Sequence, residues 1–570
     1  MAPEPAGLLK DTIPMLNAGE RLKAAAACCP DRIAIAEPIG HGRSAARDKT
    51  GKRLYRTITF GDLSDRVDRI AAGLKAFGVK KGMRLVLLVR PGKDFVTLVY
   101  ALFLTGAVVV MIDPGMGFGK MLRCLAQVRP DGFVAVSAAQ ALRVLHKKKF
   151  PDARLNVTVG HRWWWGGTTL SELERSPLLP SAEPTEPDDP AAIIFTSGST
   201  GPAKGVLYTH RIISAQVDEI GNRFSLGGGV DLAGFPFFGL YDAALGTTMV
   251  VPDMDTTRPA SVDPELFLET AEDWQITQSF ASPALWNRVV RYAAARKRRV
   301  PTLRLALSSG APFPVALLGD FLGMIAPDGD IFTPYGATES LPVAAIGARE
   351  ILSETAEKTR HGRGTCVGKR FEGIRWKIIP ISDTPLPRLE DIPPVAPGEI
   401  GELIVTGAQV TRCYVTRTEA NALSKITDAQ GAVWHRIGDL GWIDDQERFW
   451  FCGRKAHRVE TFENGTLFSV PCESIFNTDE RIARSALAGY PDPDHSGCRV
   501  PVIYLEPKNW PSSDEEKKRL LDSMRALAQS SPLTSSIGDL RLLRSFPVDI
   551  RHNAKINREK LSAMAARDKK

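Results

Sequence analysis

Apolar and polar positions alternate with two different periods along the chain from about residue 56 to 250. Short β-branched runs, such as RLVLLV from residue 84 and AAIIF from residue 191, alternate with longer amphipathic stretches, such as FGDLSDRVDRIAAGLKAFG from residue 60. Short apolar runs are typical of buried parallel strands, and the longer stretches are typical of helices. The pattern therefore predicts repeated βα units, that is, an α/β fold with doubly wound sheets.

One apolar stretch is long enough to raise the question of a membrane. FVTLVYALFLTGAVVVMI, residues 95–112, is eighteen residues without a charge, which is at the lower limit for crossing a bilayer. Thr105-Gly106 interrupts it after a helix-length segment, and the β-branched part that follows ends at Asp113-Pro114-Gly115. We therefore predict a buried helix followed by a strand, and no transmembrane segment.

The pattern changes in the second half of the chain. After about residue 397, segments such as GELIVTG and ERFWFCGR alternate with turns, as antiparallel strands do, and the C-terminal section returns to helix and strand. We predict a large N-terminal domain over 1–453, which combines mixed sheets with a β-rich subdomain. A hinge at 454–456 and a small α+β C-terminal domain over 457–570 are expected to follow.

Composition narrows the class of protein. The 570 residues are 44% hydrophobic and 24% charged, which is ordinary for a folded chain of two or three units. The net charge of +8 is modest, and the basic runs at 146–149 and 296–299 are interpreted as solvated faces, with an acidic partner or substrate as the alternative and no nucleic acid expected. The eight cysteines lack CxxC spacing and the N-terminus lacks a signal-peptide pattern, so we predict a cytoplasmic location.

Residues 195–205, FTSGSTGPAKG, have the composition of a phosphate-binding loop after a predicted strand. They contain four hydroxyls, glycines that let backbone N–H groups approach an anion, and a lysine. A Walker loop requires a lysine directly after glycine, whereas Lys204 follows Ala203, so the segment is not a P-loop. A flexible polar turn is the alternative interpretation.

This loop resembles the phosphate loop of the adenylate-forming superfamily, which includes acyl-CoA synthetases, amino acid adenylation domains and luciferases. Each further motif has an ordinary structural explanation by itself, but together they keep the superfamily's order. They are SSGAP at 308–312, YGATES at 335–340, GELIVTG at 401–407, GDLGWID at 438–444, FCGRKAHR at 451–458 and RHNAKINREKL at 551–561.

The resemblance implies a site for ATP and Mg²⁺. It implies Lys555, Glu339 and Lys204 as catalytic residues, with Glu339 also as the magnesium ligand. Because Lys555 lies on the small domain, that domain is expected to be mobile and to close over the large one about Arg454. The implied nucleotide-binding residues are Thr196, Ser197, Gly198, Ser199, Thr200, Gly201, Lys204, Gly310, Ala311, Pro312, Tyr335, Gly336, Ala337, Thr338, Asp439 and Arg454.

The segment after Gly453-Arg454 departs from the thioester-forming members of the superfamily. Those members carry Asp or Lys at the hinge and then a glycine-containing segment that admits pantetheine. This chain has Ala456 at the hinge, and only Gly465, Val470-Pro471 and Glu473 match the rest. Entry of coenzyme A is therefore in question.

Over nearly its full length the chain resembles the β-lactone synthetases of bacterial long-chain olefin biosynthesis more than it resembles acyl-CoA ligases. This resemblance implies a long-chain 2-alkyl-3-hydroxyalkanoic acid as substrate. The β-hydroxyl would attack the acyl-adenylate and close a 3,4-dialkyl-oxetan-2-one, with release of AMP and pyrophosphate. Association with other enzymes of olefin biosynthesis is a further expectation.

Four residues are candidates for the substrate pocket. Phe237, Phe238 and Gly239 stand where the superfamily usually carries an aromatic residue followed by His, and they predict an apolar wall, although core packing explains them equally well. Asp242 resembles the aspartate with which amino acid adenylation domains hold the α-amine.

Three alternative functions stay open at this point. They are a long-chain acyl-CoA ligase, an amino acid adenylating enzyme without a carrier protein, and a nucleotide-binding regulator without chemistry. RWWWGG at 162–167 has no assigned role: exposed tryptophans would indicate a partner or lipid surface, and buried ones a core.

Overall fold

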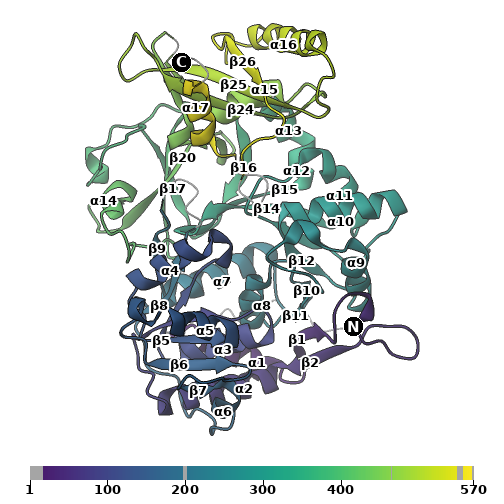
Figure 1. Ribbon diagram of the computed structural model, residues 1–570, viewed down its shortest axis with the longest axis vertical. Helices are drawn as coiled ribbons and strands as arrows, with labels where there is room; N and C mark the ends of the chain where they lie inside the picture. Colours follow the sequence, from purple (N-terminus) through teal and green to yellow (C-terminus); the bar gives the residue numbers. More distant parts are fainter. Residues whose placement is uncertain (1–16, 197–201, 464, 549–555, 568–570) are drawn as a thin grey trace.

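A seven-stranded sheet forms one layer of the large N-terminal part in the computed structural model, which describes residues 17–196, 202–463, 465–548 and 556–567. The strand order is β7-β6-β5-β3-β4-β8-β9, and all neighbours are parallel except the β8–β9 pair (Figure 1). The strands are β3 (Arg84–Leu88), β4 (Val108–Met111), β5 (Gly132–Val136), β6 (Leu155–Val159), β7 (Thr168–Thr169), β8 (Pro190–Phe195) and β9 (Gly205–Thr209). The strands predicted near residues 84 and 191 are confirmed.

Helices cover both faces of this sheet. Leu85 and Val109 pack with α2 (Phe60–Ala76) and α3 (Lys93–Leu104), whereas Val86 packs with α4 (Phe118–Gln127) and α5 (Ser137–Leu145). Adjacent strand residues enter different cores because successive side chains point to opposite faces. The predicted doubly wound arrangement is confirmed for this sheet.

The apolar stretch at 95–112 forms helix α3 and then strand β4, as predicted. Gly106 separates the two elements with φ of +67°, a conformation that side-chain-bearing residues rarely adopt. Within the described residues, no helix has the length and apolar character needed to cross a membrane.

A second, larger sheet changes character along its width. From β1 through β11, β10, β12 and β13 to β14 the neighbours are parallel, and beyond β14 they are antiparallel. The antiparallel part contains the two segments predicted after residue 397. The strands of this sheet are β1 (Ile33–Pro38), β2 (Tyr55–Thr59), β10 (Val230–Leu232), β11 (Thr248–Val250), β12 (Gln278–Ala281), β13 (Leu305–Ser308), β14 (Asp330–Ala337), β15 (Ser340–Gly347), β16 (Thr365–Arg370), β17 (Arg375–Ile379), β18 (Gly401–Thr406), β19 (Lys425–Thr427), β20 (Val433–Ile443) and β21 (Arg448–Arg454).

The parallel part of the second sheet is also covered on both faces. Ala306 of β13 packs with Trp286 and Phe321 on one side, and Leu307 packs with Ile220 and Phe238 on the other. The remaining helices of the large part are α1 (Glu20–Cys28), α6 (Leu170–Leu173), α7 (His210–Phe224), α8 (Gly239–Leu245), α9 (Pro264–Asp273), α10 (Pro283–Arg296), α11 (Leu318–Met324), α12 (Ala348–Glu350), α13 (Ala356–Arg360) and α14 (Ala420–Ser424).

The chain after β21 forms a smaller α+β layer, drawn in yellow-green at the top of Figure 1. Its own core extends from Val459 to Leu540, and helix α15 packs against β21 of the large part. Its elements are β22 (Val459–Thr461), β23 (Gly465–Leu467), α15 (Ser469–Phe476), β24 (Ile482–Pro491), β25 (Arg499–Pro507), α16 (Asp514–Gln529), β26 (Asp539–Leu542) and α17 (Arg558–Arg567). The hinge at 454–456 and the mobility of this layer stay predictions.

Candidate active site

Three of the predicted site segments follow parallel strands of the larger sheet. Phe237 and Phe238 come after β10, Gly310 to Pro312 come after β13, and Tyr335 to Glu339 end β14 and form its turn into β15. The carboxyl ends of parallel strands meet at one edge of a sheet, which is where α/β proteins bind their ligands. The fold therefore brings these segments together along one edge.

The 195–205 loop connects β8 to β9 in the smaller sheet. At its base the Thr196 N–H donates to the Lys204 carbonyl at 3.0 Å, and the Lys204 N–H donates to Thr196 Oγ1 at 3.1 Å. Ser197, Gly198, Ser199, Thr200 and Gly201 lie outside the described residues, as does Lys555.

A segment without an assigned motif, residues 410–416, joins the loop to the β14–β15 turn. Val206 of β9 pairs with Tyr414, and Ser340 of β15 pairs with Val410. The Gly205 N–H also donates to Thr416 Oγ1 at 2.7 Å. We call residues 410–416 the bridging segment, because they hold the two sheets together at the site.

Tyr414 lies at the centre of this arrangement. Its hydroxyl donates to Glu339 Oε1 at 2.6 Å, and Lys204 Nζ lies 4.6 Å from the centroid of its ring. Burial, together with the neighbouring Glu339 carboxylate, raises the pKa of Tyr414 above its ordinary value, so the phenol keeps its proton. Thr411 adds a second support, because its backbone N–H and its hydroxyl both donate to the Glu339 carbonyl at 2.9 Å.

Lys425, the first residue of β19, approaches the same cluster from the other side. Its ammonium group donates to the Thr411 carbonyl and lies 5.7 Å from the centroid of the Tyr414 ring. Burial lowers the pKa of Lys425 to about 8, even though the nearby Glu339 carboxylate acts in the opposite direction. An ammonium group with a lowered pKa, that of Lys425, thus lies near Glu339, the carboxylate predicted to bind magnesium.

Tyr335, Asp439 and Arg454 form a second group. Asp439 of β20 pairs in register with Arg454 of β21, and Arg454 Nε lies 3.0 Å from Asp439 Oδ1. The Tyr335 hydroxyl donates to Asp439 Oδ2 at 2.5 Å. Burial and the Asp439 carboxylate raise the pKa of Tyr335, and the Asp439 carboxylate raises that of Arg454. The structure thus brings together three residues that the motifs place far apart in sequence.

The four candidate pocket residues do not share one surface. Phe237 is exposed and contacts Phe95 edge to face at 5.0 Å, whereas Phe238 is buried against Phe280 at 4.9 Å. Gly239 is buried, and a Cβ atom there would lie 2.3 Å from Met249 Sδ, so a larger side chain would require Met249 to move.

Asp242 lies in the interior of the large part. Only 1% of it is exposed, and its carboxyl group faces that of Asp231 on β10, which is equally buried. Burial raises the pKa of both carboxyls, that of Asp231 to about 7. Burial therefore favours a protonated carboxyl group within this pair.

The donor set fits a magnesium ion that binds together with a nucleotide. Within the described residues, no cluster of three or more His, Cys, Asp or Glu could hold a metal ion by itself. Mg²⁺ is commonly held by one or two carboxylates with phosphate and water oxygens, and the Tyr414 hydroxyl contacts only one oxygen of Glu339. Glu339 Oε2 is therefore the atom that could contribute to such a site.

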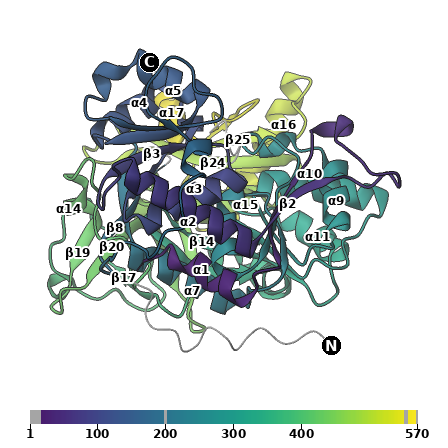
Figure 2. The ribbon, with the colours of Figure 1, turned by 90° about the horizontal axis from the view of Figure 1, so that it is seen from below.

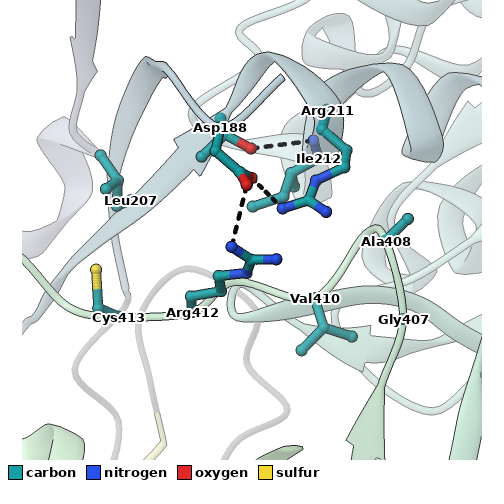
Figure 3. A pocket seen from close by; sticks show the side chains of 10 residues that line it. Asp188, Leu207, Arg211, Ile212, Gly407, Ala408, Val410, Arg412 and Cys413 are labelled. Carbon is teal, nitrogen blue, oxygen red and sulfur yellow. Dashed lines mark hydrogen bonds and ion pairs between the residues drawn. The ribbon is translucent and has the colours of Figure 1, made fainter. Parts of the chain in front are cut away.

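A small pocket lies between α7 and residues 407–413, which include the first part of the bridging segment (Figure 3). Figure 3 shows Asp188 between Arg211 and Arg412, with its carboxylate paired to both guanidinium groups. The Arg412 Nη1 to Asp188 Oδ2 distance is 3.1 Å. These charges attach the bridging segment to the start of α7.

Sequence reasoning missed Tyr414, Thr411 and Lys425. No motif identified them, and their roles depend on pairing between segments far apart in the chain. The only available signal was position, because Tyr414 follows the GELIVTG strand by seven residues.

Glu473, one of the few residues that match the thioester-forming pattern, has a structural role. Its carboxylate accepts from Arg558 Nη2 at 2.6 and 2.8 Å and from the Leu487 N–H at 2.8 Å. The match at this position therefore carries little information about coenzyme A.

Comparison with known proteins agrees with the motifs. Residues 22–415 match the family described as AMP-binding enzyme. The chain is 41% identical to the olefin beta-lactone synthetase of Stenotrophomonas maltophilia, over 96% of this chain and 98% of that protein. It is also 41% identical to the olefin beta-lactone synthetase of Xanthomonas campestris, over 95% of this chain and 96% of that protein.

Solved structures show the same fold at low identity. The amide bond synthetase McbA from Marinactinospora thermotolerans superposes with a TM-score of 0.75 at 18% identity, covering 96% of this chain and all of that one. The o-succinylbenzoate coenzyme A synthetase MenE from Bacillus subtilis, in complex with ATP and a magnesium ion, gives a TM-score of 0.69 at 20% identity, covering 95% and 99% of the two chains. The family match and the near full-length relatives are decisive: this chain belongs to the AMP-binding enzyme family, and within it to the olefin beta-lactone synthetases.

Proposed function

We propose that this protein is an ATP-dependent β-lactone synthetase in olefin biosynthesis. It adenylates a long-chain 2-alkyl-3-hydroxyalkanoic acid and closes the acyl group to a 3,4-dialkyl-oxetan-2-one. The observation that carries the proposal is the 41% identity to an olefin beta-lactone synthetase over nearly the whole length of both chains. The cluster of Lys204, Tyr414 and Glu339 supports it, because it has the charges that an adenylation site needs.

In the first half-reaction, the substrate carboxylate attacks the α-phosphorus of ATP and pyrophosphate leaves. Lys204 and the backbone of the 195–205 loop bind the triphosphate and offset its negative charge. Tyr414 and Thr411 orient Glu339, which would hold a Mg²⁺ ion, and the ion would supply further charge neutralisation. Lys555 of the small domain lies between the carboxylate and the α-phosphate when that domain closes.

The ribose and adenine are bound at the second group of residues. Asp439, held by Arg454 and Tyr335, accepts from the ribose hydroxyls, and Gly310 to Pro312 line the base. In the second half-reaction the β-hydroxyl oxygen forms a bond to the acyl carbonyl carbon and gives up its proton to water. The C–O bond to AMP breaks, and AMP leaves with the electron pair of that bond. The activated ester provides the driving force for closing the strained four-membered ring.

The test is a product assay with and without coenzyme A. The protein is incubated with ATP, Mg²⁺ and a synthetic 2-alkyl-3-hydroxy acid, and the organic products are identified by mass spectrometry. We expect a β-lactone in equal yield with and without coenzyme A. A product that forms only as the thioester would instead establish a long-chain acyl-CoA ligase.

A matched substrate separates the two half-reactions. The same acid without its 3-hydroxyl should form the acyl-adenylate and release about one equivalent of pyrophosphate per enzyme, but give no lactone. If it releases pyrophosphate continuously while a coenzyme A adduct accumulates, the β-lactone assignment is wrong. The proposal includes a cytoplasmic location and association with other enzymes of olefin biosynthesis.

A further inference from the structure

The positive charge of the chain is concentrated in residues 114–167. This segment contains nine Lys and Arg and only two Asp, an excess of seven positive charges in a chain whose total is +8. One of its arginines, Arg129, pairs with Asp152 at 2.9 Å. Lys147, Lys148 and Lys149 are all exposed. The remainder of the molecule is therefore nearly neutral, and this part is strongly basic.

The same segment exposes large hydrophobic side chains. Trp163 is 48% exposed and Trp164 is 73% exposed, with their rings stacked at 5.6 Å, and Leu145 is 75% exposed. Trp165 is buried and donates its Nε1 proton to Thr158 Oγ1 at 2.9 Å. Only one of the three tryptophans is thus packed in the interior. The other two are exposed to water, which is unfavourable for apolar side chains of this size.

The basic and apolar residues belong to one continuous region around α5. Parallel strands β5 and β6 end at the same edge, where Ser137, the first residue of α5, donates its hydroxyl to the His161 carbonyl at 2.5 Å, beside the tryptophans. The nine residues of α5 then run back over the sheet for about 13 Å and lead to Lys147. At that end the Phe118 ring of α4 lies 5.6 Å from the ring of His146.

Among the residues that the structure describes, no further element covers this region. Helices α4 and α5 lie on one face of the seven-stranded sheet, and Figure 2 shows both at the margin of the molecule, with no further layer outside them. The docking face is defined here by five exposed apolar residues and three lysines. They are Phe118, Leu142, Leu145, Trp163, Trp164, Lys147, Lys148 and Lys149.

We propose that this docking face binds reversibly to an anionic membrane surface. The lysines complement anionic headgroups, and tryptophan side chains prefer the interface between headgroups and acyl chains. A partner that offered only negative charge, such as nucleic acid, would leave the tryptophans and Leu145 without a role. Docking in this way requires no transmembrane helix, in agreement with the absence of one in the described residues.

Membrane docking goes beyond the proposed chemistry and does not depend on it. If the substrate has two long alkyl chains, it partitions into lipid, so an enzyme held at the bilayer would meet it at high local concentration. The docking face would then help to deliver the substrate, and it would take no part in the chemical step.

The experiment is co-sedimentation of the full-length protein with vesicles. Phosphatidylcholine vesicles are compared with vesicles that also contain phosphatidylglycerol, at low and high salt. We expect affinity for the anionic vesicles to exceed that for neutral vesicles about tenfold or more, and to fall with added salt because the charges are exposed. The variants Trp163→Ala/Trp164→Ala and Lys147→Gln/Lys148→Gln/Lys149→Gln should each weaken binding about tenfold.

Matched variants outside the docking face provide the controls. Phe462→Ala removes another exposed aromatic ring, and Lys297→Gln/Arg299→Gln neutralises exposed charges of the second basic run. Both should bind vesicles as the unaltered protein does. All variants should release pyrophosphate normally with a short, water-soluble 3-hydroxy acid in the absence of vesicles, which separates docking from catalysis.

Three results would overturn the proposal. The unaltered protein could stay in the supernatant with anionic vesicles at low salt, or the tryptophan and lysine variants could bind as tightly as it does. Retention by duplex DNA or self-association through this face, without vesicle binding, would assign the face to a different partner.

Discussion

Tyr414 connects the two charged groups on which the site depends. Its ring lies beside Lys204 while its hydroxyl donates to Glu339, so one side chain fixes a cation and a carboxylate relative to each other. A buried tyrosine in this position has a high pKa and keeps the proton that it donates. The orientation of Glu339 is therefore set before any nucleotide binds.

Replacing Tyr414 by Phe should weaken the use of magnesium. The ring and its contact with Lys204 remain, but Glu339 loses a hydrogen bond worth about 1 kcal/mol, so we expect the Mg²⁺ concentration for half-maximal pyrophosphate release to rise about fivefold. Calorimetric titration of ATP at several Mg²⁺ concentrations should show the same shift. Tyr241→Phe, which removes a buried hydroxyl bonded to Gln216, is the control and should leave the Mg²⁺ dependence unchanged.

Lys425 should give the free enzyme a pH dependence near pH 8. Below its pKa of about 8 the amine is protonated and attracts ATP, and above it the charge is lost, so kcat/KM for ATP should decline as the pH rises through 8. Lys425→Arg should remove the decline and keep kcat/KM within a few-fold, because guanidinium stays protonated. Lys425→Met should give a flat profile about tenfold lower. The same decline in the methionine variant would assign the titration to another group.

The Asp231–Asp242 pair should cost stability at neutral pH. The raised pKa of Asp231 means that the folded protein keeps a proton at pH values where the unfolded chain has released it. The unfolded chain releases that proton once the pH exceeds the ordinary aspartate pKa near 3.8. The free energy of unfolding therefore falls as the pH rises from about 4 to 7. Asp242→Asn removes one of the two charges, and we expect it to stabilise the protein by about 1 to 3 kcal/mol at pH 8 in denaturant unfolding.

The comparison at lower pH makes this prediction specific. The difference between Asp242→Asn and the unaltered protein should shrink at pH 5, where the pair already holds its proton. Asp445→Asn, at an exposed aspartate, should change neither value. Equal stabilities at pH 8 would show that the two carboxyls do not compete for one proton.

At the scale of elements, the predictable parts are those determined by local periodicity. Strands such as β3 and helices such as α2 were predicted because their apolar residues recur with the period of the element itself. The bridging segment could not be predicted, because it is defined by pairing with β9 and β15, which lie far from it in sequence. The burial of Asp242, one of the candidate pocket residues, could not be predicted from the sequence, because it depends on which face of α8 packs against the sheet.

The close packing of α8 on β11 at Gly239 can be tested. A Cβ atom at Gly239 would overlap Met249 Sδ, so Gly239→Ala should lower the free energy of unfolding by about 1 to 3 kcal/mol. Met249→Ala creates space, so Gly239→Ala should cost less stability in the Met249→Ala background than in the unaltered protein. A double-mutant cycle with unfolding in urea measures this difference. A coupling energy near zero would mean that the helix moves away from the strand at no cost.

At the scale of the whole molecule, the candidate site is divided between the two parts of the chain. Lys204, Glu339 and Asp439 lie on the large part, whereas Lys555 precedes α17 of the C-terminal layer. Arg558 at the start of α17 is bound to Glu473 of α15, which ties this end of the chain to the core of the small layer. The motifs predict this division, but local patterns cannot give the orientation of one part relative to the other.

If the small layer supplies the lysine that joins the two reacting anions, Lys555→Ala should separate nucleotide binding from chemistry. ATP·Mg²⁺ binding, measured by calorimetry, should stay within about threefold, because Lys204 and Glu339 bind the triphosphate. Pyrophosphate release should fall about a hundredfold or more, because the carboxylate and the α-phosphate then repel each other without a cation between them. Lys560→Ala, which removes an exposed lysine of α17, should keep full activity. If Lys555→Ala instead binds ATP poorly and reacts normally once saturated, the lysine contributes to binding alone, and closure of the small layer over the large one is not required for adenylation.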